Sequence, residues 1–340
     1  MSQAIAFINP RLSTANVGDI FIEDSVKRIL DFDPERSVDI DPRKPLNPGD
    51  IERINQCDVA VIVGTNLWYQ QVRKPNRWLI SVDELKQIKI PFVPLGVGTT
   101  QHRSEVDSFR FDEETVALLR QIHDMCEASS ARDPRTYETL QKAGISNVVM
   151  TGCPTLYRSL KPHWTLNQKQ TDKIVVTARK GQDRNLQIIM KELVRRGKQP
   201  VIAAQKKNDL YCAKRRFPLY RPGPESLYKF DIKPYQSLVE KAYGAIGWRL
   251  HGNMFHLAHG NPTMFFANCS RCLSFSEAFG LPCIYAEDGE MVPESDLIKS
   301  VDHLLAADTY ELFPERYAKY YQEMARFLDR NSIRHHLQQI

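Results

Sequence analysis

Short apolar segments alternate with segments of helical periodicity along most of this 340-residue chain. Residues 4–9, 58–64 and 92–98 are compact apolar runs, whereas residues 20–30 and 112–126 carry apolar side chains at helical spacing. One such pair follows another about every 20 to 30 residues. Repeated strand and helix patterns of this kind predict an α/β fold, with a parallel sheet covered by helices on both faces.

The alternation is interrupted between residues 154 and 171 and restarts with the apolar run at 173–179. The interrupting segment lacks periodicity, which is typical of a linker between domains. Since a chain of this length suits two cores, we expect a Rossmann-like N-terminal lobe at residues 1–160 and a Rossmann-like C-terminal lobe at 172–306. Residues 307–340 are expected to form a helical segment that packs back on a lobe through an apolar stripe, made of Tyr317, Tyr320, Tyr321, Met324 and Leu328.

The composition is that of an ordinary globular protein, with 42% hydrophobic and 26% charged residues. A net charge of +5 suits anionic ligands or an anionic membrane surface, but it is small for a nucleic-acid-binding protein. No apolar run approaches the roughly 18 residues that a membrane span needs, and the N-terminus lacks the pattern of a signal peptide. We therefore expect a cytoplasmic protein without nucleic-acid partners. Peripheral contact with the inner face of the membrane and the oligomeric state are left open.

The seven cysteines are an odd number scattered along the chain, which favours reduced thiols over a disulfide framework. Cys269 and Cys272 form a C-x-x-C pair, and His251, His256 and His259 lie nearby in sequence. A structural zinc site usually needs two such pairs. The sequence therefore predicts no metal site, and the thiols are interpreted as packing or surface groups.

Residues 244–262 predict a buried strand that ends at Arg249, a turn at His251 and Gly252, and a helix from about Asn253 to Gly260. Ligands of open α/β sheets bind at the carboxyl ends of the strands, where a helix N-terminus favours anions. A guanidinium matches carboxylate or phosphate, and an imidazole exchanges a proton near neutral pH. Arg179 closes the strand at 173–179 and is expected at the same level as Arg249, so both could hold one anionic ligand.

This stretch resembles the signature of the polysaccharide pyruvyl transferase family, which carries an Arg-Leu-His-Gly run, here residues 249–252, before a small-residue helix, a glycine, a proline and an apolar strand. Asn16-x-Gly18-Asp19, Arg132-Asp133 and Gln205 with Asp209 are similar to other elements of the family pattern. The chain departs from that pattern at residues 65–68, where the family usually has glycines, at Thr99-Thr100, and at Cys153, where it usually has aspartate.

The resemblance implies a fold similar to that of GT-B glycosyltransferases and a transferase that uses phosphoenolpyruvate as donor. The acceptor would be a hydroxyl pair of a saccharide, lipid-linked or free, and the product a pyruvate ketal in a cell-surface polysaccharide. Arg179 and Arg249 would bind the donor, the backbone N–H groups of Leu250 and Gly252 would contact its phosphate, and His251 would be the general acid. Protonation of His251 is expected to accompany donor binding. No further cofactor is expected.

The acceptor or the cleft around it is expected to involve residues from both lobes, namely Asn16, Asp19, Asn66, Trp68, Arg132 and Asp209. Asp19 could equally cap the following helix. Trp68 could stack on a sugar ring or cover the edge of a core.

Two other classes of function stay open, because a fold does not fix a function. The first is a GT-B glycosyltransferase that uses a nucleotide sugar, with Asp209 or Glu277 available for a ribose. The second is a non-catalytic saccharide-binding protein, which the departures at residues 65–68, 99–100 and 153 would fit.

Overall fold

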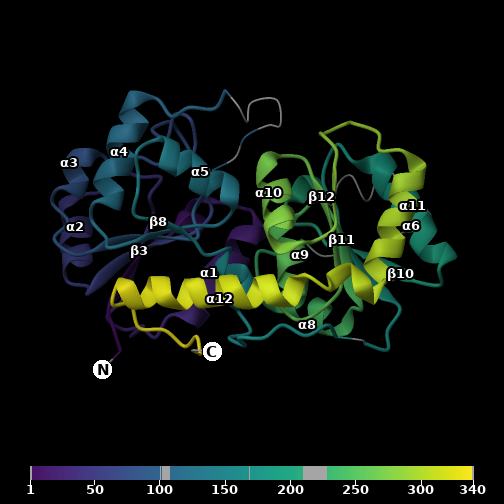
Figure 1. Ribbon diagram of the computed structural model, residues 1–340. Coiled ribbons are helices and arrows are strands. Elements are labelled where there is room, and N and C mark those ends of the chain that lie inside the picture. The colour runs from purple at the N-terminus through teal and green to yellow at the C-terminus, as the bar shows by residue number, and fades with distance from the viewer. Residues whose placement is uncertain (1, 100, 102–107, 168, 210–227, 339–340) are drawn as a thin grey trace. The chain divides into compact units, whose positions relative to one another are not determined.

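The computed structural model describes residues 2–99, 101, 108–167, 169–209 and 228–338 (Figure 1). Thr100, one of the departures noted above, lies outside these residues. The chain forms two compact units. The first contains residues 1–14, 22–162 and 318–340, and the second contains residues 15–21 and 163–317. The division thus differs from the expected lobe limits at residues 15–21 and 318–340.

The first unit is built on a parallel sheet in the order β2-β1-β3-β5. Its strands are β1 (Ile5–Ile8), β2 (Val38–Ile40), β3 (Val59–Val63) and β5 (Phe92–Leu95). Hydrogen bonds of Val97 and Arg132 continue the sheet toward β7 (Ser129–Ala131) and its partner β8 (Val148–Met150). β4 (Asn66–Trp68) pairs with β6 (Gly98–Thr99). Every residue of β3 is buried, which explains its continuous apolar sequence.

Five helices follow these strands: α1 (Val17–Ile29), α2 (Pro48–Asn55), α3 (Val82–Leu85), α4 (Glu113–His123) and α5 (Pro134–Lys142). Polar side chains before the helices determine where several of them begin. Asp112 caps α4 and Asp133 caps α5, each accepting a hydrogen bond from a backbone N–H three residues on. α2 and α3 begin with capping boxes at Asn47 and Ser81.

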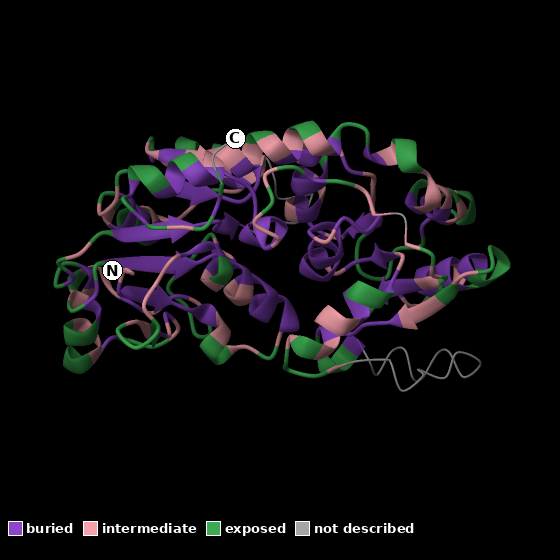
Figure 2. Cartoon of the chain, turned by 90° about the horizontal axis from the view of Figure 1, so that it is seen from below, coloured by how far each residue is buried: buried purple, intermediate pink, exposed green. Residues whose placement is uncertain are grey.

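The second unit contains a five-stranded parallel sheet in the order β10-β9-β11-β12-β13. The strands are β9 (Lys173–Thr177), β10 (Gln199–Ile202), β11 (Gly244–Gly247), β12 (Thr263–Ala267) and β13 (Cys283–Tyr285). α6 (Asp183–Arg195) and α11 (Glu294–Leu305) cover one face of the sheet. α8 (Lys233–Lys241), α9 (Leu250–Leu257) and the start of α1 cover the other. α10 (Ser270–Phe279) packs against β12 and β13. Most strand residues of both units are buried (Figure 2).

The division between the units passes through two helices, α1 and α12 (Phe313–Arg330). Residues 17–21 of α1 belong to the second unit, as do residues 313–317 of α12. In the stripe expected along α12, Tyr317, Tyr321, Met324 and Leu328 are buried, whereas Tyr320 is only partly so. The segment before α12 contains the 3-10 helix η4 (Ala307–Tyr310), and η1 (Pro10–Ser13) and η3 (Pro154–Tyr157) are the others that the structure describes.

In the part of the chain that the structure describes, no helix combines the length and apolar character needed to cross a bilayer.

Candidate functional site

The five strands of the second unit run parallel, so their carboxyl ends lie along one edge of the sheet. Thr177 of β9 is paired with Gly247 of β11. Arg179 and Arg249 each follow one of these paired residues by two positions, so the structure places both arginines at the same level of neighbouring strands. Ligands of open α/β sheets bind at this edge.

The strand before Arg249 and the helix after it have other limits than the sequence suggested. β11 ends at Gly247 rather than at Arg249, because Gly247 has a φ of 144°, and a Cβ there would approach the carbonyl oxygen of Thr177 to 2.5 Å. α9 begins at Leu250 rather than Asn253, with Arg249 as its N-cap residue in an extended conformation. His251 and Gly252 therefore lie in the first turn of the helix and not in a separate turn.

Arg249 is held by Asp209, whose side chain is fully buried, and keeps 12% of its own side chain exposed. The second carboxylate oxygen of Asp209 accepts hydrogen bonds from the backbone N–H groups of Lys206 at 3.0 Å and Gln205 at 3.3 Å. Asp209 thus joins the segment after β10 to the guanidinium after β11. Burial and the nearby Arg249 lower the pKa of Lys206, against the opposing effect of Asp19 and Asp209.

Arg179 makes a two-pronged ion pair with Asp288, which follows β13. Arg179 Nε donates to Asp288 Oδ1 at 2.7 Å, and Nη2 donates to Oδ2 at 2.8 Å. These hydrogen bonds raise the pKa of Arg179 and lower that of Asp288, whose carboxylate is also stabilised by the charge of Arg249. Asn268, which follows β12, lies beside the same pair. Residues after all five strands therefore contribute to one cluster of charged and amide groups.

His251 is 6% exposed and lies beside the start of α1. A Cβ on Gly18 would come within 3.3 Å of His251 Nδ1 and 3.1 Å of Gln205 Oε1. A Cβ on Gly252 would overlap the amide nitrogen of Gln205 and lie 3.2 Å from Thr177 Cγ2. Because Gly18 and Gly252 have no side chains, the Gln205 side chain fits between the N-termini of α1 and α9.

The start of α1 also differs from the expectation. The helix begins at Val17 rather than Ile20, and the Val17 N–H donates to the carbonyl oxygen of Gln205 at 3.0 Å. Asn16 provides the cap, since its side-chain oxygen accepts from the Gly18 N–H at 3.3 Å. Asp19 lies within the first turn, where a carboxylate is favoured by the helix dipole, and does not cap the helix as considered from the sequence.

The six residues expected near the acceptor are divided between the units. Asn16, Asp19 and Asp209 belong to the second unit. Asn16 and Asp19 lie at the start of α1, which contacts Gln205 and His251, and Asp209 pairs with Arg249. Asn66, Trp68 and Arg132 belong to the first unit. Arg132 is fully buried, contacts Asn66 and lies 3.7 Å from the carboxylate of Asp133. The absence of a Cβ on Gly98 leaves room for its guanidinium.

Trp68 is fully buried in the core of the first unit, next to Trp78 and His123. Stacking on a sugar ring needs an accessible ring face, so the structure assigns Trp68 the core-packing alternative. Residues 66–68 form the short strand β4, whose two apolar side chains, Leu67 and Trp68, lie in the hydrophobic core of the first unit.

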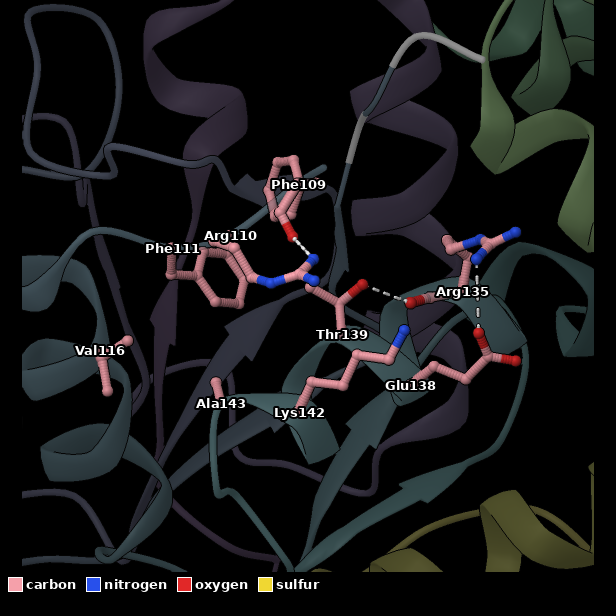
Figure 3. Close-up of a pocket in the computed structure, with 9 residues that line it drawn as sticks. All are labelled: Phe109, Arg110, Phe111, Val116, Arg135, Glu138, Thr139, Lys142 and Ala143. Carbon is pink, nitrogen blue, oxygen red and sulfur yellow. Dashed lines mark hydrogen bonds and ion pairs between the residues drawn. The ribbon is translucent and has the colours of Figure 1, made fainter. Parts of the chain in front are cut away.

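A separate pocket of about 110 Å³ lies on the first unit, between α5 and the segment before α4 (Figure 3). Phe109 and Phe111 pack edge to face at its rim, with ring centroids 5.3 Å apart. Arg135 forms a 3.5 Å ion pair with Glu138 on one side, and Lys142 follows one turn later on the same helix. The pocket lining includes the charged side chains of Arg110, Arg135, Glu138 and Lys142.

The cysteines considered for zinc lie near β13. Cys269 and Cys272 are buried, and a hydrogen bond with Cys283 and burial raise the pKa of Cys272. No group of three histidine, cysteine or acidic side chains with the geometry to hold a metal ion gathers among the described residues.

Asn253, Asn268 and Asp288 were not predicted as site residues. Asn253 is fully buried, accepts from Thr177 Oγ1 at 2.8 Å and donates to the carbonyl oxygen of Gly247 at 2.8 Å, which fixes α9 to β9 and β11. Asn268 directly follows β12 and Asp288 follows β13, so their positions just after predicted strands could have marked them as site residues. These positions indicate a shared site only once the order of the strands in the sheet is known.

Solved structures with similar folds span nearly the whole chain. A putative UDP-N-acetylglucosamine 2-epimerase from Listeria monocytogenes aligns with a TM-score of 0.50 at 10% identity, covering 96% of this chain and 95% of that one. The UDP-GlcNAc 2-epimerase from Methanocaldococcus jannaschii aligns with a TM-score of 0.49 at 12% identity, covering 97% and 99%. At these identities the similarity shows the fold alone. The expected fold class, two Rossmann-like units of the GT-B type, is confirmed.

No curated protein sequence matches the chain. A model of the family described as polysaccharide pyruvyl transferase matches residues 15–270, which include the Asn16 motif, both arginines and His251. Because the match covers most of the sequence, the chain belongs to the polysaccharide pyruvyl transferase family.

Proposed function

We propose that this protein transfers the pyruvate group of phosphoenolpyruvate to two hydroxyls of a saccharide, forming a pyruvate ketal and releasing phosphate. The observation that carries this proposal is the position of Arg179 and Arg249 at the same level of neighbouring strands, with His251 in the helix turn that follows Arg249. Phosphoenolpyruvate has a carboxylate and a phosphate on one small enol. Two guanidinium groups at fixed positions suit such a doubly anionic molecule.

Binding would use charge and backbone donors together. Arg249 is oriented by the buried Asp209 and keeps part of its guanidinium exposed. The N–H groups of Leu250 and Gly252 lie in the first turn of α9, where helix N–H groups have no partner within the helix. Lys206 adds a third positive charge near both arginines. This arrangement would neutralise the donor and hold it in one orientation, which lowers the entropic cost of reaction.

The chemistry requires a proton at the methylene carbon of the donor. In the proposed reaction the His251 imidazolium supplies that proton, and the first saccharide hydroxyl attacks the adjacent carbon. Phosphate then leaves and the second hydroxyl attacks the same carbon. One hydroxyl proton restores His251 and the other leaves with phosphate, so the atoms and charges balance. Phosphoenolpyruvate is a substrate here, and we propose no resident cofactor.

The remaining groups near His251 would serve the acceptor. Asp19 is 7% exposed and lies in the first turn of α1, whose backbone packs against Gln205. A carboxylate at this place could accept a hydrogen bond from a saccharide hydroxyl and orient it toward the donor. The acceptor sugar, and whether it is lipid-linked, would be identified by assay.

The proposal is tested by incubating the purified protein with phosphoenolpyruvate and a panel of saccharides, while measuring phosphate release and product mass. We expect phosphate release that depends on both substrates and a ketal on the saccharide. Arg249→Gln and His251→Asn should abolish it. Arg195→Gln is the matched control, because Arg195 is a 65% exposed arginine of the same unit whose carboxylate partner is Glu192. Equal activity of the His251 variant would remove its role as the acid.

The same assay separates the other two classes of function. A nucleotide-sugar glycosyltransferase would release a nucleoside diphosphate from UDP-sugars and leave phosphoenolpyruvate unchanged. A non-catalytic saccharide-binding protein would bind saccharide without consuming either donor.

A further inference from the structure

We propose that Asp288 occupies part of the donor site in the free protein and is displaced from Arg179 when the donor binds, so that this carboxylate sets donor affinity. This inference rests on the proposed function, because it assigns the fork of Arg179 to an anionic group of the donor. It adds a residue that opposes binding to the groups that favour it.

The ion pair leaves no free donor on one edge of the guanidinium. Arg179 offers a fork of Nε–H and Nη2–H, and Asp288 accepts from both, at 2.7 and 2.8 Å. A carboxylate or a phosphate would bind the same fork with the same geometry. The charge of Arg249 also lowers the pKa of Asp288. The carboxylate thus lies in the field of both arginines, as expected for a group that takes the place of a donor anion.

The carboxylates that pair with the two arginines differ in burial. The side chain of Asp209 is fully buried, whereas that of Asp288 is 49% exposed. Removing Asp209 from Arg249 would leave a carboxylate buried without its partner, which is costly. Asp288 can turn into water, where its carboxylate is solvated, so breaking its pair costs far less than breaking the buried one. Asp288 is therefore the partner that a ligand can replace.

The backbone around Asp288 is fixed, so the displacement needs only a side-chain rotation. The Gly289 N–H donates to the carbonyl oxygen of Gly181 at 3.0 Å, and Gln182 Nε2 donates to the carbonyl oxygen of Glu287 at 2.6 Å. These bonds attach the segment after β13 to the start of α6. A carboxylate on a fixed backbone can leave and return without rearranging the sheet edge.

Asn268 lies against the same fork of Arg179. With its amide oxygen facing the guanidinium, the oxygen accepts from Arg179 Nη2 at 2.7 Å and from Nε at 3.0 Å. A neutral amide oxygen is a weaker acceptor than a carboxylate. Of these two partners of Arg179, only Asp288 therefore opposes the binding of a donor anion by its charge.

The test is the affinity for phosphoenolpyruvate of the wild type, Asp288→Asn and the control Asp302→Asn, measured by calorimetry. Asp302 pairs with Arg196 in the same unit and is similarly exposed, at 46%. We expect Asp288→Asn to bind phosphoenolpyruvate about two- to five-fold more tightly, because the donor no longer has to break a half-exposed, two-pronged ion pair. Asp302→Asn should bind as the wild type does. Unchanged or weaker binding by Asp288→Asn would overturn the proposal, because it would make Asp288 a bystander or a positioning residue.

Three further measurements keep the result interpretable. Asp288→Ser tests the same loss of charge if Asp288→Asn melts at a lower temperature than the wild type. Titration with inorganic phosphate tests the exchange without assuming the donor, and Asp288→Asn should again bind more tightly. Absence of phosphoenolpyruvate binding with tighter phosphate binding by the variant would refute the proposed function and retain the role of Asp288. In Arg179→Gln, removal of the Asp288 charge should no longer increase affinity.

Discussion

Gly252→Ala is expected to destabilise the second unit, although Gly252 lies in a helix. Alanine normally favours a helix over glycine by about 1 kcal/mol. Here the added Cβ would overlap the amide nitrogen of Gln205, whose residue is only 4% exposed, and would lie 3.2 Å from Thr177 Cγ2. Overpacking of this kind costs about 1 to 3 kcal/mol. The clash is with the end of a side chain that can shift only as far as its burial allows, so we expect a net loss of about 0 to 2 kcal/mol instead of the gain that helix propensity alone would give.

The assay is urea unfolding of the wild type, Gly252→Ala, Gln205→Ala and the double variant. Truncating Gln205 removes the atom that the new methyl group would meet, so Gly252→Ala should cost little in the Gln205→Ala background. The coupling between the two positions should be about 1 kcal/mol or more. A Gly252→Ala protein more stable than the wild type by about 1 kcal/mol, as helix propensity alone predicts, would refute the packing described for this turn, and so would an equal effect in both backgrounds.

Three other perturbations test different parts of the structure. Burial lowers the pKa of His123 and of His256 to about 3. Below the unfolded pKa of about 6.5 each histidine takes up a proton only in the unfolded state, so each should lower the free energy of unfolding by about 2 kcal/mol at pH 5. Urea unfolding between pH 8 and pH 5 should show this loss of stability, and His256→Gln should make the loss smaller. Asp209→Asn should weaken phosphoenolpyruvate binding about ten-fold by releasing Arg249, and calorimetry that finds wild-type affinity would contradict the positioning role. Trp68→Ala should cost about 3 to 5 kcal/mol because it empties a fully buried site, whereas thermal unfolding close to that of the wild type would place Trp68 at the surface.

The sequence predicted which two strands of the second unit precede Arg179 and Arg249, although both strands end two residues earlier than expected, at Thr177 and Gly247. Arg179 and Arg249 follow apolar runs that could only be buried parallel strands, and the pairing of Thr177 with Gly247 brings them to the same level. The sequence motifs contain Gly18 and Gly252, but they do not indicate why glycine is needed at these two positions. Gly18 and Gly252 leave room for Gln205, a residue distant from both in sequence.

What could not be predicted depends on the order of the strands. Asp288 meets Arg179, although β11 and β12 lie between their strands in the sheet, because side chains after the strands reach along its edge. Periodicity does not give this order. Trp68 was ambiguous because the strand that contains it, Asn66–Trp68, has only three residues and is too short to show a strand periodicity. The start of α1 joins the second unit through a hydrogen bond to Gln205, which no local pattern indicates.

Calorimetric titration with phosphoenolpyruvate of the wild type, Arg179→Gln and Arg249→Gln most directly tests whether the two arginines form a donor site. We expect saturable binding at one site per chain, weakened at least about ten-fold by either substitution, since each removes a charge-assisted hydrogen-bonding group. Absence of binding to the folded wild type, or equal affinity in all three proteins, would contradict a donor site formed by the two arginines.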